Sequence, residues 1–321
     1  METVEELEAL EETVGTPQRE VHTAARETAG PAQAWDCRNV TFPPLRPSAD
    51  EPAQPGGAAV AQVLALTGAR GGLGASVLLL HLAWALSRTG RRVAMMDLDP
   101  AGGLDLLCGE AVLTGLRWAD LPAEESAFRP GHLVGALPVW HAMPVLTADV
   151  RGGPTGCEEA VLKAMRTEHD VVLVDLPRGT PPPPGAKVLL LTGLDLRSAV
   201  AAESIAPRLR GPHPGDAAPA DAPGSPPVWL VVRQVGEDVA PEDLELITGC
   251  PVLGHVPTDR VLTKRLALGE DPVRARSATR RAATALTREL LARVLVAGTP
   301  RPEPVGGGAG GQERGSEPWS R

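Results

Sequence analysis

Short runs of apolar residues alternate along the chain with segments that carry apolar residues at helical spacing. The runs that are apolar throughout, as buried strands are, lie at 63–67, 93–97, 171–175, 187–192 and 228–232, with shorter candidates at 139–146 and 252–253. The helical segments lie at 77–88, 158–167, 198–209, 241–248, 259–268 and 276–296. Apolar strands that alternate with helices predict an α/β fold, with a mostly parallel central sheet covered by helices on both faces.

The first apolar run leads directly into a glycine-rich turn and a helix. Gly71, Gly72 and Gly74 form the turn, and the helical pattern begins at Val77. The backbone N–H groups of such a turn, together with the positive end of the helix dipole, make an anion site. This order of elements is typical of a P-loop NTPase. The P-loop pattern is G-x-x-x-x-G-K-[ST], in which the lysine contacts the β- and γ-phosphates and the hydroxyl binds Mg²⁺.

The match to this pattern fails at two positions. Gly74 and Ser76 occupy their expected places, but Ala75 stands at the lysine position and Ala69 at the first glycine. The sequence therefore predicts a phosphate cradle and a Mg²⁺ hydroxyl without the main phosphate cation. An ordinary strand–helix turn is the alternative, and the acidic residues that accompany the loop argue against it.

Acidic residues follow two of the other buried runs. Asp97 and Asp99 end the second run, and Asp175 ends the third. Ligands of parallel sheets bind beyond the carboxyl ends of the strands, so we expect these residues to converge on Ser76 in space. Helix capping, or a place in a solvated loop, is the alternative for Asp97 and Asp175.

Composition narrows the class of protein. The net charge of −9 over 321 residues argues against a generic nucleic-acid binder. The four cysteines form no C-x-x-C pair, and the histidines have no metal-ligand spacing, so neither a zinc site nor a disulfide framework is predicted. The acidic start lacks the pattern of a signal peptide, and no apolar run approaches the ~18 residues of a membrane span. A cytoplasmic protein is expected.

Changes in composition divide the chain. Residues 1–58 are expected to be an acidic N-terminal extension and linker, largely disordered. The main domain is expected over 59–298, interrupted at 211–227 by a loop of Pro, Ala and Gly. Residues 299–321 are expected to form a disordered tail.

Several motifs, taken together and in order, resemble the ParA/MinD superfamily of deviant P-loop ATPases. The loop Arg70–Ser76 lines up with K-G-G-x-G-K-[ST], VAMMDLDP with a strand followed by D-x-D-P, and DVVLVDLP with a Walker B strand. PVLGHVPTDR resembles a segment that comes late in the family's sequence and lies near the base of the nucleotide. The resemblance covers roughly 60–298 and implies the P-loop NTPase-like fold.

A narrower resemblance is to the CpaE/TadZ-like, septum-site-determining-like actinobacterial branch. Loops with Ala in place of Lys recur there, as do stretches like Gly102–Leu107 and Gly115–Leu121. Members of that branch usually carry a receiver-like domain before the P-loop, and residues 1–58 are too short for one.

The resemblance implies residue roles around ATP or ADP with Mg²⁺. Ser76, Asp99 and Asp175 would hold the metal, and Asp97 would orient the attacking water. The residues expected to contact the nucleotide are Gly71, Gly72, Leu73, Gly74, Ala75, Ser76 and Val77, with Arg233 and Pro257 near the base.

Two arginines stand at positions where the family carries other residues. Arg70 replaces the signature lysine, which in the family crosses a dimer interface to the partner's phosphates, so it would keep a cation there. Arg233 stands where active members carry an adenine-reading Asn, which weakens the case for ATP in particular.

These roles favour a MinD/ParA/CpaE-like nucleotide-binding spatial regulator with weak or absent ATP hydrolysis. It would act as a homodimer with division or pilus/secretion proteins, placing a septum or a secretion apparatus, in the cytoplasm or at the inner face of the membrane, septum or pole. The alternatives are an active ATPase in which Arg70 compensates for Ala75, and a scaffold that binds no nucleotide.

Three features of the sequence each leave two interpretations open. Nine Lys and Arg against three acids over 260–293 indicate either a solvated face or nonspecific DNA binding, which is not favoured. Leu286, Leu290 and Val294 line one helix face, which either packs on the sheet or lies on a membrane. Trp118 either packs under a loop or anchors a partner.

Overall fold

The computed structural model describes residues 61–109, 114–122, 128, 133–210, 227–273 and 276–295, all within the compact unit Gly56–Arg321. The predicted extension 1–58, nearly all of the loop 211–227 and the tail 299–321 lie outside the described residues, so these predictions stay open. None of the described helices is both long enough and apolar enough to span a bilayer.

The described residues form one eight-stranded sheet with the strand order β3-β4-β2-β5-β1-β6-β7-β8. Every neighbouring pair is parallel except β3 and β4, which confirms the predicted mostly parallel α/β sheet. The strands are β1 Gln62–Gly68, β2 Val93–Asp97, β3 Val139–Trp140, β4 Met143–Leu146, β5 Val171–Asp175, β6 Lys187–Gly193, β7 Val228–Arg233 and β8 Val252–Val256.

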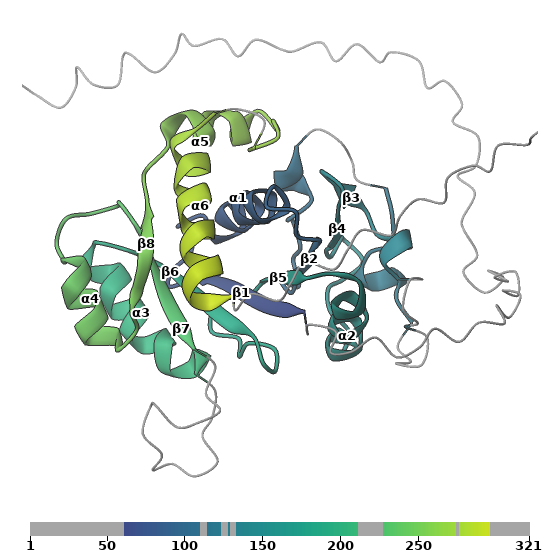
Figure 1. Cartoon of the computed structure of the whole chain (residues 1–321), viewed down its shortest axis with the longest axis horizontal. Helices are drawn as coiled ribbons and strands as arrows, with labels where there is room; N and C mark the ends of the chain where they lie inside the picture. The colour runs from purple at the N-terminus through teal and green to yellow at the C-terminus, as the bar shows by residue number, and fades with distance from the viewer. Residues whose placement is uncertain are drawn as a thin grey trace, which may run out of the picture. The chain divides into compact units, whose positions relative to one another are not determined.

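Helices cover both faces of the sheet (Figure 1). They are α1 Ala75–Ser87, α2 Glu158–Glu168, α3 Leu196–Leu209, α4 Pro241–Thr248, α5 Arg260–Ala267 and α6 Ala278–Glu289, followed by a π-helical turn at Leu290–Val294. The crossover through α1 runs toward β2 at one edge, whereas the crossovers through α3 and α4 run toward β8 at the other. Right-handed crossovers in opposite directions place their helices on opposite faces. Accordingly α6 packs on α1, and α4 packs on α3.

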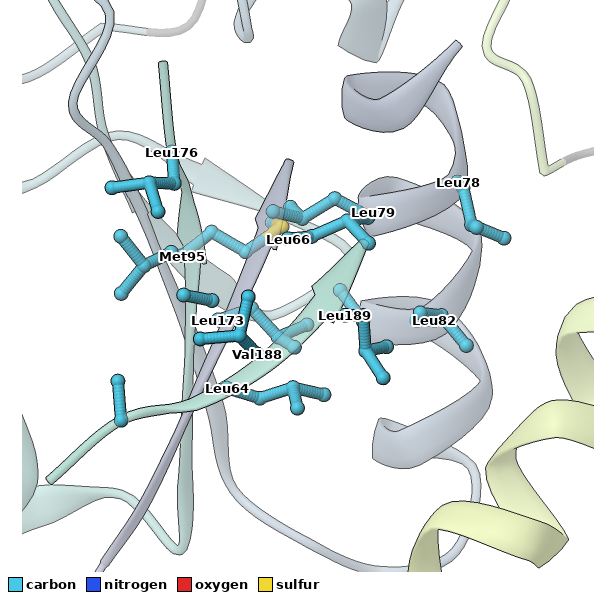
Figure 2. Close-up of a cluster of buried hydrophobic side chains, with 14 of the residues drawn as sticks. Leu64, Leu66, Leu78, Leu79, Leu82, Met95, Leu173, Leu176, Val188 and Leu189 are labelled. Atoms are coloured by element: carbon cyan, nitrogen blue, oxygen red, sulfur yellow. The ribbon is translucent and has the colours of Figure 1, made fainter. Parts of the chain in front are cut away.

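The core is aliphatic, as the scarcity of aromatic residues requires. β1 lies between β5 and β6, and Leu79 of α1 points toward these strands, whereas Leu78 points away from them on the other side of the helix (Figure 2). α1 is buried on most of its circumference because the sheet covers one side and α6 the other. This packing fixes the start of α1, and therefore the glycine turn before it, against the end of β1.

The segment 139–146 differs from the single brief strand that the sequence predicted. It forms a hairpin, β3–β4, in which His141 and Ala142 reverse the chain with φ of 48° and 63°. Two successive left-handed residues are the geometry of a type I′ turn, which usually carries Asn-Gly. The pair His-Ala therefore gave no turn signal in the sequence.

Burial decides between the two interpretations of Trp118 and between those of the last helix. Trp118 is fully buried, and its Nε1 donates a hydrogen bond to the Asp97 carbonyl oxygen at 2.7 Å. Leu286, Leu290 and Val294 are buried as well, so this face packs inside the fold and is not available to a membrane in this structure.

Candidate functional site

A hollow of about 680 Å³ lies beyond the carboxyl ends of β1, β2 and β5. Residues 70–77 of the glycine turn form one wall, and Gly102–Leu107 lines another part of it. Asp97 and Asp175 are paired in register at the ends of β2 and β5, and Asp99 lines the same hollow. The acids and Ser76, which are far apart in the sequence, are therefore brought together as expected.

The glycine turn has the conformation of an open anion cradle. Gly72 and Gly74 have φ of 78° and 85°, the left-handed region that favours glycine. A Cβ added at Gly71 or Gly72 would meet no other atom within 4 Å, so the space in front of these amides is open. Gly74 is the residue that precedes α1, which aims the positive end of the helix at the same space. This backbone fits a phosphate group.

Asp175 is a buried carboxyl group in a negatively charged environment. It is buried, and burial raises its pKa to about 7, while a hydrogen bond from Ser76 acts in the opposite direction. The charges of Asp97 and Asp99 act in the same direction as burial and contribute to this raised pKa. A divalent cation would relieve this concentration of negative charge.

The donor set suits Mg²⁺ shared with a phosphate better than a metal held by protein alone. Among the described residues, no group of three His, Cys, Asp or Glu could hold a metal ion. Mg²⁺ is usually held by one or two carboxylates together with substrate phosphates. The Ser76 hydroxyl and Asp175 supply two protein groups that fit such an arrangement.

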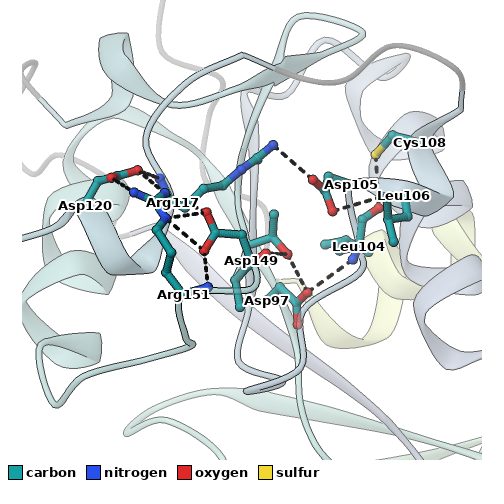
Figure 3. Close-up of polar contacts among 11 residues, drawn as sticks. Asp97, Leu104, Asp105, Leu106, Cys108, Arg117, Asp120, Asp149 and Arg151 are labelled. Carbon is teal, nitrogen blue, oxygen red and sulfur yellow. Dashed lines mark hydrogen bonds and ion pairs between the residues drawn. The ribbon is translucent and has the colours of Figure 1, made fainter. Parts of the chain in front are cut away.

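Asp97 and Asp99 differ in what their oxygens contact. Asp97 is 1% exposed; its Oδ1 accepts from the Asp99 amide at 2.9 Å, and its Oδ2 accepts from the Thr147 hydroxyl at 2.8 Å and the Leu104 amide at 3.3 Å (Figure 3). Asp99 is exposed, and its Oδ1 accepts from the Ala101 amide. Asp97 thus ties three segments together, whereas Asp99 is the acid that faces open space.

Arg70 is held inside the monomer by the start of α3. Its Nη2 donates to Asp195 Oδ2 at 2.8 Å, and its Nε donates to the Ser198 hydroxyl at 2.7 Å. Asp195 is kept charged: burial alone would raise its pKa, but hydrogen bonds from Ser198 and Arg70 lower it to about 2. Arg70 lines the hollow, yet its guanidinium is directed to this carboxylate.

Arg233 and Pro257 lie outside the set of residues that line the hollow. Arg233, at the end of β7, donates from Nη1 to the Leu73 carbonyl at 2.6 Å. A Cβ added at Gly74 would lie 2.7 Å from that nitrogen, so the guanidinium rests against the back of the glycine turn. Pro257 follows Val256, which is paired with Arg233 in the sheet.

The sequence analysis missed Arg178. It follows Asp175 by three residues, lines the hollow and is exposed. Within the described part of the chain its guanidinium has no hydrogen-bonding or ion-pairing partner. The signal available in the sequence was a cation directly after the acidic strand end, beside a P-loop that lacks its lysine.

The loop at the mouth of the hollow is braced by ion pairs that sequence reasoning also missed (Figure 3). Arg117 pairs with Asp105 at 3.0 Å. Arg151 bridges Asp120 at 2.9 Å and Asp149 at 2.6 Å. The Arg117 pair ties Gly102–Leu107 to the segment that carries Trp118, the Arg151 pairs join that segment to Asp149, and Leu106 is 78% exposed at the mouth.

Comparison with known proteins supports the class that the fold and the site define. The family model of the cellulose biosynthesis protein BcsQ matches residues 61–201. The uncharacterized protein Rv3660c of Mycobacterium tuberculosis is 33% identical over 203 residues, which make up 57% of this chain and 57% of that protein. The chromosome-partitioning ATPase Soj of Thermus thermophilus is 32% identical over 124 residues, 37% of this chain and 47% of Soj. The chain thus spans about half the length of these curated relatives.

Solved structures show the same fold at low sequence identity. A ParA family ATPase from Chlorobium tepidum superposes with a TM-score of 0.59 at 15% identity, covering 72% of this chain and 99% of that one. MinD in a MinC:MinD complex from Aquifex aeolicus gives 0.56 at 20% identity, covering 75% and 99%. MinD with Mg-ADP from Pyrococcus horikoshii gives 0.54 at 17% identity, covering 74% and 99%.

The glycine cradle, the acidic strand ends and the sheet order together define a P-loop NTPase-like protein. The family match, the similarity to Soj and the shared fold make the chain similar to proteins of the ParA/MinD superfamily.

Proposed function

We propose that this protein is a nucleotide-binding spatial regulator that binds ATP or ADP with Mg²⁺ and hydrolyses ATP slowly or not at all. The observation that carries the proposal is the hollow at the glycine turn, which keeps the cradle, Ser76 and Asp175 but has Ala75 at the lysine position. Nucleotide binding and ATP hydrolysis depend on these features to different degrees, so binding can persist when hydrolysis is lost.

Binding draws on the groups that remain. The amides of the glycine turn and the start of α1 supply donors and positive potential for phosphate. Ser76 and Asp175 are already hydrogen-bonded to each other at the place where Mg²⁺ would join a phosphate. Asp99 is the exposed acid beside them, and we assign it, in preference to the enclosed Asp97, the contact with metal-bound or attacking water.

Turnover depends on charge that the P-loop lacks. Phosphoryl transfer is accelerated almost entirely by positioning and by neutralising the charge on the transferred group. Losing one preorganised donor typically costs about 10²–10³-fold in rate. Arg70 does not replace the lysine in this structure, because Asp195 and Ser198 hold its guanidinium. Slow or absent hydrolysis follows.

The cellular role rests on the resemblance and on the relatives. A MinD neighbour is in complex with MinC, and Soj is a chromosome-partitioning ATPase. We propose that this chain likewise forms a nucleotide-dependent homodimer that recruits division or pilus/secretion proteins to the septum, pole or inner membrane face. The CpaE/TadZ-like branch is the subgroup that its degenerate loop favours.

The test is calorimetry of the full chain with Mg²⁺-ATP and Mg²⁺-ADP, with phosphate release followed in the same samples. We expect binding with negligible release. Ser76→Ala should weaken binding by about tenfold, because it removes a metal ligand and the hydrogen bond to Asp175. Ser204→Ala, an exposed serine on α3, is the matched control and should bind like the wild type.

The other outcomes separate the alternatives. Phosphate release at an ordinary ATPase rate, abolished by Arg70→Ala, would identify an active ATPase with a compensating arginine. Absence of binding up to millimolar nucleotide would identify a scaffold that uses this fold without its ligand.

A further inference from the structure

A second hollow, of about 530 Å³, lies at the opposite end of the strands from the glycine turn. It is formed by the end of α1, the turn Gly90–Arg92, the start of β2, the tip of the β3–β4 hairpin and His169. β2 begins here at Val93 and ends at Asp97 in the first hollow, so the strand separates them by roughly 13 Å. We call it the basic hollow.

The charges of the basic hollow do not cancel. Arg88, Arg91 and Arg92 all line it. Arg92 pairs with Asp170 at 3.2 Å, but within the described residues neither Arg88 nor Arg91 has a hydrogen-bonding or ion-pairing partner for its side chain. Gly90, with φ of 82°, turns the chain between them and returns Arg91 to the hollow. Asp170 also lies close enough to Arg91 for that charge to help lower the Asp170 pKa, so three guanidiniums share one carboxylate here, in a chain whose net charge is −9.

The other acids near the hollow are also engaged. Asp271 accepts from His141 Nε2 at 2.7 Å and so fixes the imidazole at the hairpin tip. Glu168 lies close enough to influence the pKa of His169, which burial nevertheless lowers, and it has a partner of its own. Asp170 is therefore the carboxylate that offsets the arginines of the hollow, and it carries one charge against their three.

Backbone strain marks the same place. Among the described residues, His141 and Ala142 are the only non-glycine residues with positive φ, and both line the basic hollow. Strained residues of this kind persist where the surrounding structure holds them, and they gather at binding and catalytic sites. The hairpin tip is thus held in a costly conformation directly opposite the arginines of the hollow.

A simpler explanation accounts for only part of this arrangement. Basic side chains at the end of a helix interact favourably with its dipole, which explains Arg88 just after α1. Arg91 lies beyond the turn at Gly90, and the dipole effect falls off within the last turn of a helix. The hollow and the strained tip remain unexplained by it.

We propose that the basic hollow binds a small phosphate-bearing molecule, at a site separate from the glycine turn. Guanidinium groups match phosphate oxygens with paired hydrogen bonds. A phosphate monoester carries close to two negative charges at neutral pH, which matches the excess of the three lining arginines over the single carboxylate of Asp170. The volume lies within the range of small-molecule pockets, about 300–1,000 Å³. The site would let a phosphorylated ligand act on the protein from the far end of β2.

The test uses inorganic pyrophosphate as the probe and hydrogen exchange as a readout that reports each hollow separately. On adding millimolar pyrophosphate to the full chain, we expect slower exchange in residues 84–93 and 141–143. Arg88→Ala/Arg91→Ala should lose this protection and weaken the corresponding affinity at least tenfold. Arg208→Ala/Arg288→Ala removes two exposed arginines elsewhere, with the same change of charge, and should keep the protection.

Protection of 84–93 that is unchanged in Arg88→Ala/Arg91→Ala, or no protection there in the wild type, would overturn the proposal. Protection by phosphatidylglycerol vesicles but not by pyrophosphate would also overturn it, since the phosphate would then belong to a lipid headgroup. If the alanine pair fails to fold, Arg88→Lys/Arg91→Lys keeps the charge but removes the paired hydrogen bonds, and should weaken binding several-fold. Exchange in residues 68–77 reports the glycine turn independently, so this result does not depend on nucleotide binding.

Discussion

The two hollows lie at opposite ends of the same strands and carry opposite charge. At the carboxyl ends, Asp97, Asp99 and Asp175 gather beside a cradle of backbone amides. At the amino ends, Arg88 and Arg91 face the strained hairpin tip. The first hollow sets three acids against Arg178, whereas in the second hollow the arginines outnumber the one carboxylate that they share.

Part of this difference lies at one position, Ala75, where the P-loop pattern has a lysine. With Ala75 in place, the charge for phosphate must come from Mg²⁺ or from an arginine on another element. Arg70 is occupied by Asp195, and Arg233 rests behind the glycine turn on the Leu73 carbonyl. Arg178 is the remaining arginine that lines this hollow, and in the described structure it has no partner.

Placing a lysine at position 75 should have the largest effect, which we expect on ATP turnover at the first hollow. Ala75→Lys places an ammonium at the start of α1, within the hollow. We expect ATP turnover, measured as phosphate release, to rise by about 10²-fold, the size of the effect of one preorganised donor. Ala75→Met supplies a long side chain without charge and should leave turnover at the wild-type level. Equal turnover in the two variants would show that the missing charge does not limit hydrolysis.

Removing Arg178 should have a moderate effect. The arginine is exposed, so its attraction to a bound phosphate is screened and amounts to about 1 kcal/mol, or roughly fivefold in affinity. Calorimetry of Arg178→Ala with Mg²⁺-ATP measures this loss. Arg166→Ala, on α2 outside the hollow, is the matched control. If both variants bind alike, the charge at this site comes from the metal and the backbone alone.

Local patterns were enough to predict most of the fold. Runs such as 171–174 are apolar throughout because β5 is buried on both faces, and this pattern predicts a parallel sheet. The glycine turn and the acidic strand ends were predictable for the same reason, since the carboxyl ends of parallel strands must meet at one edge. The hairpin at 139–146 was not predictable, because His141 and Ala142 are unusual residues for their turn.

What could not be predicted depends on contacts between distant segments. Nothing near Arg70 in the sequence shows that Asp195, 125 residues away, accepts its hydrogen bond. Nothing near Asp97 shows that Thr147, 50 residues away, occupies one of its oxygens. The basic hollow likewise needs the hairpin tip to approach the end of α1. Residue types at a strand end therefore predict where a site lies, but not which of its groups are free.

Neutralising Asp175 should have a smaller effect, on stability. In the folded protein its pKa is raised to about 7, against about 3.9 for an unfolded aspartate, so the folded state favours the protonated form. This stabilisation is complete below the unfolded pKa and is lost as the pH rises through about 7. Without Mg²⁺ or nucleotide, Asp175→Asn should melt about 2–4 °C above the wild type at pH 8, and the gap should close toward pH 5.

The control for this pH dependence is Glu203→Gln, an exposed acid on α3, whose melting temperature should follow the wild type at both pH values. Mg²⁺-nucleotide should narrow the gap at pH 8, because the bound cation favours the charged aspartate that the Asn variant lacks. A gap that is independent of pH would show that burial of the Asp175 charge does not destabilise the protein.

The smallest effect is expected at the hairpin tip, where a substitution tests whether the backbone of the turn that lines the basic hollow is strained. Ala142 has φ of 63°, which costs a residue with a Cβ about 1–2 kcal/mol, whereas glycine adopts it freely. Glycine also loses more entropy on folding, so Ala142→Gly should stabilise the protein by only about 0.5–1 kcal/mol, seen as a rise of about 1–3 °C in melting temperature. Ala119→Gly, at an exposed alanine with ordinary φ, should destabilise it instead. If Ala142→Gly is destabilising too, the turn carries no strain that glycine can relieve. The proposal of a phosphate site in the basic hollow would then depend on Arg88 and Arg91 without support from the turn.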